Sequence, residues 1–215
     1  YKKVRNFPWS AAQNMNGWEY GTNLNYLKNI SKYWITKYNW KKFENKINSF
    51  KNYKTKVEDI NLHFIFEKSK NPNSKPLLLL HGWPGSITEF LDIIPRLAHP
   101  EKFGGKIEDG FDIIVPSLPG FGFSSQIKKA LGPRKIGKIL NKFMVKNLGY
   151  KNYFVQGGDW GATIAGWIGL DSSKNCKGIH INCLPLRHPK GTKNIKEKKW
   201  EKKFNFDQIM QEGYR

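Results

Sequence analysis

The chain has few cysteines: Cys176 and Cys183 are the only two in 215 residues. Two thiols are too few for the disulfide framework of a small secreted protein, and they lack partners at metal-ligand spacing. The chain also lacks an apolar run of the roughly 18 residues that a membrane-spanning helix needs, and its first residues do not form a signal-peptide pattern. We therefore expect plain thiols, and neither a metal nor another cofactor.

Acidic residues are also scarce, and so is arginine. The chain has 17 Asp and Glu residues against 37 Lys and Arg residues, a formal net charge of +20. Such a charge suits an acidic partner, either nucleic acid or an anionic membrane surface. The excess is concentrated at residues 128–151 and 174–203 and is nearly all lysine, whereas base-edge and bidentate phosphate recognition favour arginine. We therefore expect no nucleic-acid partner, and a basic module for nucleic acid or anionic lipid is the least favoured alternative.

The composition is that of one domain with a sizeable core, since 39% of the residues are hydrophobic and 14% are aromatic. Four apolar runs have the length of buried strands, at residues 77–80, 111–116, 153–155 and 178–182. A capping-box pattern predicts a helix over 86–97 unless Pro95 ends it sooner. Apolar spacing predicts another helix from Pro133 to Leu148. Strands that alternate with helices predict an α/β fold with a doubly wound, mainly parallel sheet.

The N-terminal part of the chain has a different pattern. Residues 1–22 contain aromatic and turn residues without a period, which indicates an extended arm. Apolar residues recur at helical spacing from Asn23 and again from Trp40, so two amphipathic helices are expected. Residues 54–58 and 62–66 are predicted to follow as paired edge strands.

A strand, a sharp turn and a helix are predicted around residues 157–161, Gly-Gly-Asp-Trp-Gly. Glycines flank the reactive residue in a nucleophile elbow because the turn is strained and its backbone passes close to the helix. Asp159 occupies the reactive position here. A carboxylate can attack a saturated carbon and form an ester, a reaction suited to strained epoxides or to alkyl halides.

Two further motifs precede this turn. Residues 81–86, His-Gly-Trp-Pro-Gly-Ser, follow a buried strand, and residues 116–124 form a loop rich in Pro and Gly. The three motifs in this order resemble the epoxide hydrolases of the α/β-hydrolase fold, in particular the microsomal type, which includes the juvenile hormone epoxide hydrolases of insects. Residues 18–21 and 62–65 also resemble motifs of that family.

The resemblance implies roles for individual residues. Asp159 would be the nucleophile, and the backbone N–H groups of Trp83 and Trp160 would form the oxyanion hole. Tyr214, in a Glu-x-Gly-Tyr segment, would donate a proton to the epoxide oxygen. The residues that support these motifs are His81, Gly82, Pro84, Gly157, Gly158 and Gly161.

The resemblance also implies an organisation of the chain. Residues 1–53 would be an N-terminal wrapping region, 54–185 an incomplete α/β-hydrolase core, and 186–215 the start of a lid. The catalytic acid and histidine are expected beyond Arg215. The implied substrate is a lipophilic epoxide, such as a juvenile hormone or a xenobiotic epoxide. The implied location is the endoplasmic reticulum or microsomal membrane, through an anchor not present in this chain.

Alternatives to an epoxide hydrolase remain open at this point. A haloalkane dehalogenase shares the Asp chemistry but uses halide-binding donors in place of a lid tyrosine. A binding protein with this fold that has lost its base, or that reacts only once, is the second alternative. His180 lies within an apolar strand, so we expect a structural histidine with satisfied hydrogen bonds there, not a catalytic one.

Overall fold

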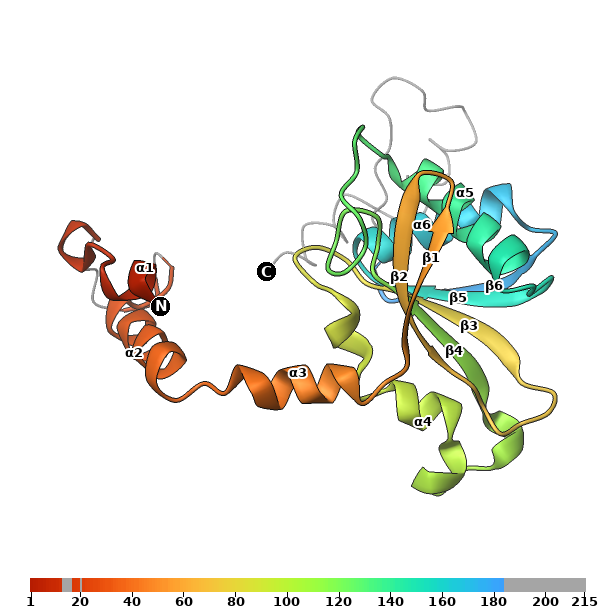
Figure 1. Ribbon diagram of the computed structural model, residues 1–215, viewed down its shortest axis with the longest axis horizontal. Coiled ribbons are helices and arrows are strands. Elements are labelled where there is room, and N and C mark those ends of the chain that lie inside the picture. The colour runs from red at the N-terminus through yellow and green to blue at the C-terminus, as the bar shows by residue number, and fades with distance from the viewer. Residues whose placement is uncertain (13–16, 20, 184–215) are drawn as a thin grey trace, which may run out of the picture. The chain divides into compact units, whose positions relative to one another are not determined.

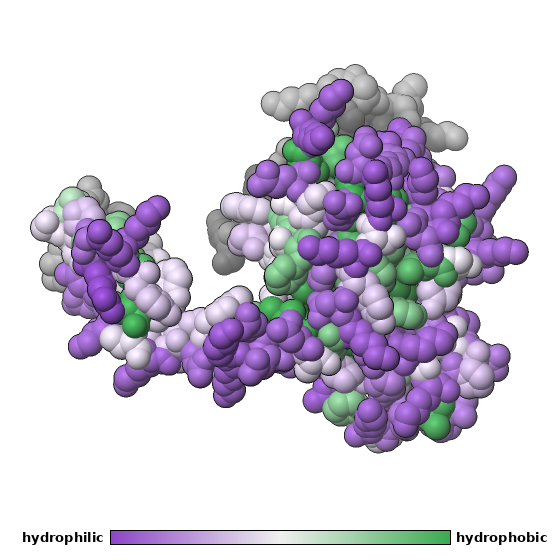
Figure 2. Space-filling view, viewed as in Figure 1, coloured by the Kyte–Doolittle hydropathy of each residue, from purple (hydrophilic) through white to green (hydrophobic). Residues whose placement is uncertain are grey.

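The computed structural model describes residues 1–12, 17–19 and 21–183, which belong to two compact units (Figure 1). The N-terminal unit comprises Tyr1–Asn52, and the sheet unit begins at Tyr53. Hydrophilic side chains cover much of the face drawn in Figure 2, with apolar groups between them.

The N-terminal unit contains the two amphipathic helices that the sequence predicts. They are α2 (Leu24–Thr36) and α3 (Trp40–Asn48), and each begins after an asparagine whose side chain accepts a backbone N–H. The predicted extended arm is wrong in its first part, because α1 (Lys2–Arg5) and the 3-10 turn η1 (Trp9–Ala11) form there. Backbone bonds within these turns, such as Arg5 N–H to Tyr1 O at 3.0 Å, satisfy polar groups locally.

In the part of the chain that the structure describes, the sheet has six strands in the order β1-β2-β4-β3-β5-β6. Their bounds are β1 Asn52–Val57, β2 Ile60–Glu67, β3 Lys75–Leu80, β4 Phe111–Pro116, β5 Tyr153–Gly157 and β6 Cys176–Ile181. Strands β4, β3, β5 and β6 pair in parallel, and β2 pairs with β4 antiparallel. The predicted doubly wound, mainly parallel sheet is confirmed. The predicted pair of edge strands needs a correction, because β1 is at the edge but β2 lies between β1 and β4.

Helices cover the two faces of the sheet. Helices α5 (Pro133–Lys142) and α6 (Trp160–Asp171) pack over one face, where Leu78, Leu80 and Val155 join the main apolar core (Figure 1). A π-helical turn, η5 (Phe143–Asn147), extends α5 to the predicted end of the helix. The opposite face carries the alternate side chains, such as Leu77 and Leu79. It is partly covered by residues from the segment between β3 and β4.

The helix predicted over 86–97 is interrupted. The structure has a 3-10 turn, η2 (Ile87–Phe90), and then a short helix, α4 (Ile94–Ala98). The capping box at Ser86 and Glu89 is present at the start of η2. Pro95 stands in the first turn of α4, where its missing N–H costs nothing, whereas inside a continuous helix it would remove a hydrogen bond. The remaining short turns are η3 (Pro100–Phe103) and η4 (Ile107–Asp109).

Within the described residues, no helix has the length and apolarity needed to cross a membrane.

Candidate active site

Asp159 stands at the sharp turn between β5 and α6, as the sequence predicts. Its φ of 49° and ψ of −123° place a non-glycine residue in the strained left-handed range of φ. The side chain makes no capping bond to α6, and the residue is exposed. The turn therefore presents the carboxylate to solvent at the carboxyl end of β5.

Two glycines allow this turn to sit tightly between the strand and the helix. A Cβ at Gly157 would collide with the Gly161 carbonyl, and a Cβ at Gly161 would collide with the carbonyl of Leu80. Because Leu80 ends β3, the second contact brings the turn against the neighbouring strand. The glycine spacing thus fixes the position of Asp159 between two parallel strands.

The turn at residues 81–86 approaches Asp159 from β3. The backbone N–H of Trp83 donates a hydrogen bond of 2.8 Å to Oδ1 of Asp159. Gly82 permits this approach, since a Cβ there would collide with the Asp159 side chain. The peptide between Trp83 and Pro84 is cis. The structure therefore brings Asp159, Trp83 and the adjacent Trp160 together.

The N–H of Trp160 lies at the start of α6, where the first N–H groups of a helix have no partner within the helix. Helix N-termini carry partial positive charge, which favours an anion. Trp160 follows Asp159 directly in the chain, so its N–H is one of these first helical donors. The Trp83 N–H is the backbone donor that bonds the carboxylate.

His81 also holds the turn at residues 81–86 in place. Its side chain is buried; Nε2 accepts the Leu118 N–H at 3.0 Å, so Nδ1 carries the proton and donates to Gly82 O at 3.0 Å. The Gly82 carbonyl and the Trp83 N–H belong to one peptide group, so His81 orients the group that contacts Asp159. Burial lowers the pKa of His81 and favours this neutral form.

The loop after β4 is fixed by a second buried histidine. His63 Nδ1 lies 2.9 Å from Ser117 Oγ, and the Ser117 N–H donates to His63 O at 2.9 Å. Burial, with a smaller effect of the Lys54 charge, lowers the pKa of His63 to about 4. Ser117 precedes Leu118, the donor to His81, so a chain of contacts links His63 to the site. In the sequence, His63 is predicted only as a strand residue, because no local pattern identifies Ser117 as its partner.

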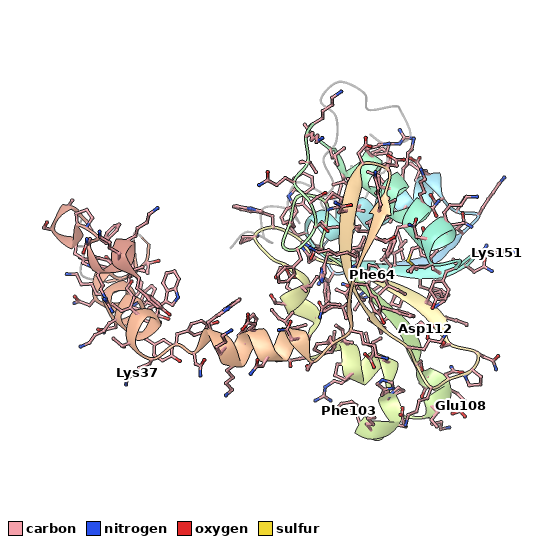
Figure 3. The ribbon with its side chains drawn as sticks, in the orientation of Figure 1. Lys37, Phe64, Phe103, Glu108, Asp112 and Lys151 are labelled. Carbon is pink, nitrogen blue, oxygen red and sulfur yellow. The ribbon has the colours of Figure 1, made fainter. Side chains whose placement is uncertain are left out.

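Asp112 is a buried acidic residue outside the site, and no sequence motif indicated it. Asp112, in β4, is fully buried and accepts bonds from Lys68 Nζ at 2.6 Å, Ser74 Oγ at 2.7 Å and Tyr150 OH at 2.8 Å (Figure 3). Burial alone would raise the pKa of Asp112, but Lys68 and the other donors hold it below the usual value. The cluster joins β4 to the loop between β2 and β3 and to the loop before β5. Asp112 belongs to the amino-terminal half of β4, so the cluster does not face Asp159.

Of the remaining predicted positions, His180 is described by the structure and Tyr214 is not. Tyr214 lies outside the described residues, as do His188 and the whole segment from 184 onward. His180 differs from its expectation: it is exposed on β6, and its side chain has no hydrogen-bond partner within the described residues. The described residues contain no group of three or more His, Cys, Asp or Glu side chains placed to hold a metal ion.

The order of strands agrees with comparisons to known proteins. Residues 75–208 match the family described as alpha/beta hydrolase fold. The chain belongs to the α/β-hydrolase fold family. Residues 1–90 match the model described as epoxide hydrolase N terminus.

Individual relatives of this α/β-hydrolase are named epoxide hydrolases. Epoxide hydrolase 1 of Oryctolagus cuniculus is 41% identical over 79% of this chain and 38% of its own length. Juvenile hormone epoxide hydrolase 1 of Ctenocephalides felis is 38% identical over 83% of this chain and 38% of its own length. The crystal structure of juvenile hormone epoxide hydrolase from Bombyx mori has a TM-score of 0.77 and 34% identity, covering 87% of this chain and 45% of that one. The chain thus spans less than half the length of these relatives.

Proposed function

We propose that this chain carries the nucleophile of an epoxide hydrolase, which opens lipophilic epoxides through an ester on Asp159. The observation that supports this most directly is the bond from the Trp83 N–H to Oδ1 of a strained, exposed Asp159. A turn of this kind presents a nucleophile, and the bonded amide is positioned to stabilise charge on the same carboxyl group. The names of the relatives favour an epoxide as the substrate.

We infer different tasks for the two carboxylate oxygens. Within the described residues, Oδ1 has the Trp83 N–H as its partner, whereas Oδ2 has none. Oδ2 attacks a ring carbon and forms the ester bond, while the carbon–oxygen bond of the epoxide breaks. The alkoxide takes a proton from a donor, for which we propose the Tyr214 hydroxyl.

The second half of the reaction hydrolyses the ester. Oδ1 is then the carbonyl oxygen, and attack of water on the ester carbon places negative charge on it. The N–H groups of Trp83 and Trp160 stabilise that charge, an interaction whose removal costs about 10²–10³ in rate in other enzymes. Two of the three motifs, at residues 81–86 and 157–161, thus serve one oxygen atom.

Hydrolysis also requires a base that activates water. His63 and His81 are bonded within the loops, and His99 Nε2 lies 2.7 Å from Glu67. His180 is exposed on β6 and has no carboxylate partner within the described residues. We propose that the base and its acid lie outside the described residues, as the resemblance implies. A chain without this base forms the ester but releases it slowly, by the lost general-base factor of about 10²–10⁴.

The test is mass spectrometry of the 215-residue chain after incubation with a lipophilic 1,2-epoxyalkane. The expected result is one adduct on the peptide that contains Asp159, absent from Asp159→Asn. Absence of an adduct, or an adduct that persists in Asp159→Asn, overturns the proposal. A bromoalkane of equal carbon number is run in parallel, and exclusive reaction with the bromide would favour a haloalkane dehalogenase.

A location at the endoplasmic reticulum or microsomal membrane stays a prediction that rests on the resemblance alone.

A further inference from the structure

A polar pocket of about 340 Å³ lies between β1 and the loop that follows β4. It is lined by residues 54–56 of β1, by Asn61 at the start of β2 and by residues 123–125 of the loop. No acidic side chain is among these described residues, and neither Asp159 nor Trp83, which bonds it, belongs to the lining. The pocket is therefore suited to an anion and is separate from the proposed nucleophile.

Lys54 and Lys56 supply the positive charge of this pocket. They are two residues apart in β1, so their side chains share one face of the strand. Glu58 follows them at the turn, but it pairs with Lys135 at 3.0 Å and with Lys142 at 3.7 Å. Within the described residues, the ammonium groups of Lys54 and Lys56 have no carboxylate partner, so their charges are not neutralised there.

Asn61 and Ser125 add neutral donors to the two ammonium groups. Ser125 Oγ accepts the Asn61 N–H at 3.1 Å, so the hydroxyl proton of Ser125 remains to be donated. Neither this proton nor the side-chain amide of Asn61 has an acceptor in the part of the chain that the structure describes. An oxyanion in the pocket can therefore accept hydrogen bonds from two charged and two neutral groups.

The loop side of the pocket is held in place by bonds within the fold. Ser124 Oγ accepts the His63 N–H at 3.0 Å and donates to a carbonyl of its own loop at 2.7 Å. The Ser125 N–H donates to Asn61 O at 2.9 Å. The Phe123 ring makes an edge contact with the His63 ring, with 5.0 Å between the centroids. A ligand therefore orders mainly the two lysine side chains when it binds, which favours affinity.

Phe123 adds an aromatic surface to the charged one. The residue is 48% exposed, so part of its ring is open to a ligand. The pocket volume is near the lower limit of about 300 Å³ for small-molecule sites, which is more than a bare ion needs. The ligand therefore has room for a small ring beside its anionic group.

We propose that this pocket binds a phosphate monoester that carries a small aromatic group. The phosphate contacts Lys54 and Lys56, and the ring lies against Phe123. A phosphate monoester carries a charge of about −1.5 to −2 at pH 7 and has three strong acceptor oxygens, which match the donors of the pocket. A carboxylate brings one charge only. The inference is independent of the proposed function.

The test is NMR of the isotope-labelled 215-residue chain, titrated at constant ionic strength with phenyl phosphate, inorganic phosphate or benzoate. We expect saturable shifts of the Asn61, Ser124 and Ser125 amide signals with phenyl phosphate, at millimolar affinity because exposed ion pairs are individually weak. Inorganic phosphate should bind about two- to tenfold more weakly, because it makes no contact with the Phe123 ring. Benzoate, with a ring but a single charge, should bind more weakly than phenyl phosphate.

Variants test the lysines and the ring separately. Lys54→Gln and Lys56→Gln each remove one charge and should weaken phenyl phosphate binding about two- to fivefold. Lys106→Gln is the matched control, since Lys106 is also exposed but does not line the pocket. Phe123→Ala should abolish the advantage of phenyl phosphate over inorganic phosphate.

Several outcomes would overturn the inference. Amide shifts that do not saturate, or that are as large on lysine-rich surfaces elsewhere, show that no specific site exists. An equal loss of affinity in Lys54→Gln and Lys106→Gln, or equal binding of benzoate and phenyl phosphate, overturns it as well. The wild-type titration decides the question even if a variant fails to fold. Ester formation on Asp159 is measured separately, so failure of the proposed function and failure of this inference are distinguishable.

Discussion

The backbone N–H of Trp83 donates a hydrogen bond of 2.8 Å to Oδ1 of Asp159, although 76 positions separate the two residues in the chain. The contact joins the turns that follow β3 and β5, which pair in parallel from Leu77 and Phe154 onward. His81 bonds the carbonyl of the peptide that supplies this N–H. The site thus depends on the pairing of two strands and on one buried imidazole.

Gly82→Ala is expected to displace the Asp159 carboxylate, because a Cβ at this position collides with it. A carboxylate displaced by about 1 Å from its position should form the ester about 10²-fold more slowly. Gly166→Ala is the control, because a Cβ there meets nothing within 4 Å. Adduct formation measured by mass spectrometry should be normal in Gly166→Ala, and an equal rate in Gly82→Ala would contradict the geometry.

His81→Phe is expected to destabilise the fold. It leaves the buried Leu118 N–H without its acceptor, at a cost of about 1–3 kcal/mol in the free energy of unfolding. His81→Gln can supply an acceptor and a donor from its amide and should recover part of this loss. Denaturant unfolding gives both values, and ester formation should follow the same ranking. Equal stability of the two variants would show that the hydrogen bonds of His81 are unimportant.

His63 should make stability depend on pH. The pKa of its imidazole is about 4 when folded, because of burial, and near 6.5 when unfolded. As the pH falls, the unfolded state therefore binds a proton before the folded state does. The contribution of His63 to the free energy of unfolding is thus complete above pH 6.5 and decreases toward pH 4. The full effect is about 3 kcal/mol, at about 1.4 kcal/mol for each unit of pKa difference.

The measurement for His63 is the difference in unfolding free energy between wild type and His63→Gln from pH 7 to pH 4. Taking this difference removes the contributions of other titrating groups, including His81. The difference should shrink as the pH falls. A constant difference over this range would mean that protonation of His63 is not coupled to folding.

Asp112→Ala is expected to be severely destabilising. It removes the acceptor of Lys68, Ser74 and Tyr150 inside the fold, and breaking a buried charge cluster typically costs about 3–5 kcal/mol. Asp109→Ala, at an exposed residue of η4, should change stability by no more than about 0.5 kcal/mol. Thermal or denaturant unfolding of the two variants compares a buried acid with an exposed one, and similar losses would refute the role of the cluster.

Much of the fold was predictable because its strands are continuous apolar runs between turn residues. The predicted strand at 111–116 has the bounds of β4, and the glycines around Asp159 indicated the turn before its geometry was known. The break within 86–97 was harder to predict, because its apolar spacing fits a continuous helix and only Pro95 opposes it. The interior position of β2 depends on pairing with β4, which local periodicity does not encode.

By itself, the sequence determined the local features: which runs form strands, where a glycine-flanked turn presents Asp159, and that a carboxylate holds the reactive position. Only the tertiary structure decided which amide meets that carboxylate, that His81 fixes this amide through Gly82, and that His63 supports the loop through Ser117. The physical reason is the distance along the chain over which each effect acts. Backbone conformation and apolar periodicity act over a few neighbouring residues, whereas these contacts join strands that become adjacent only when the sheet forms.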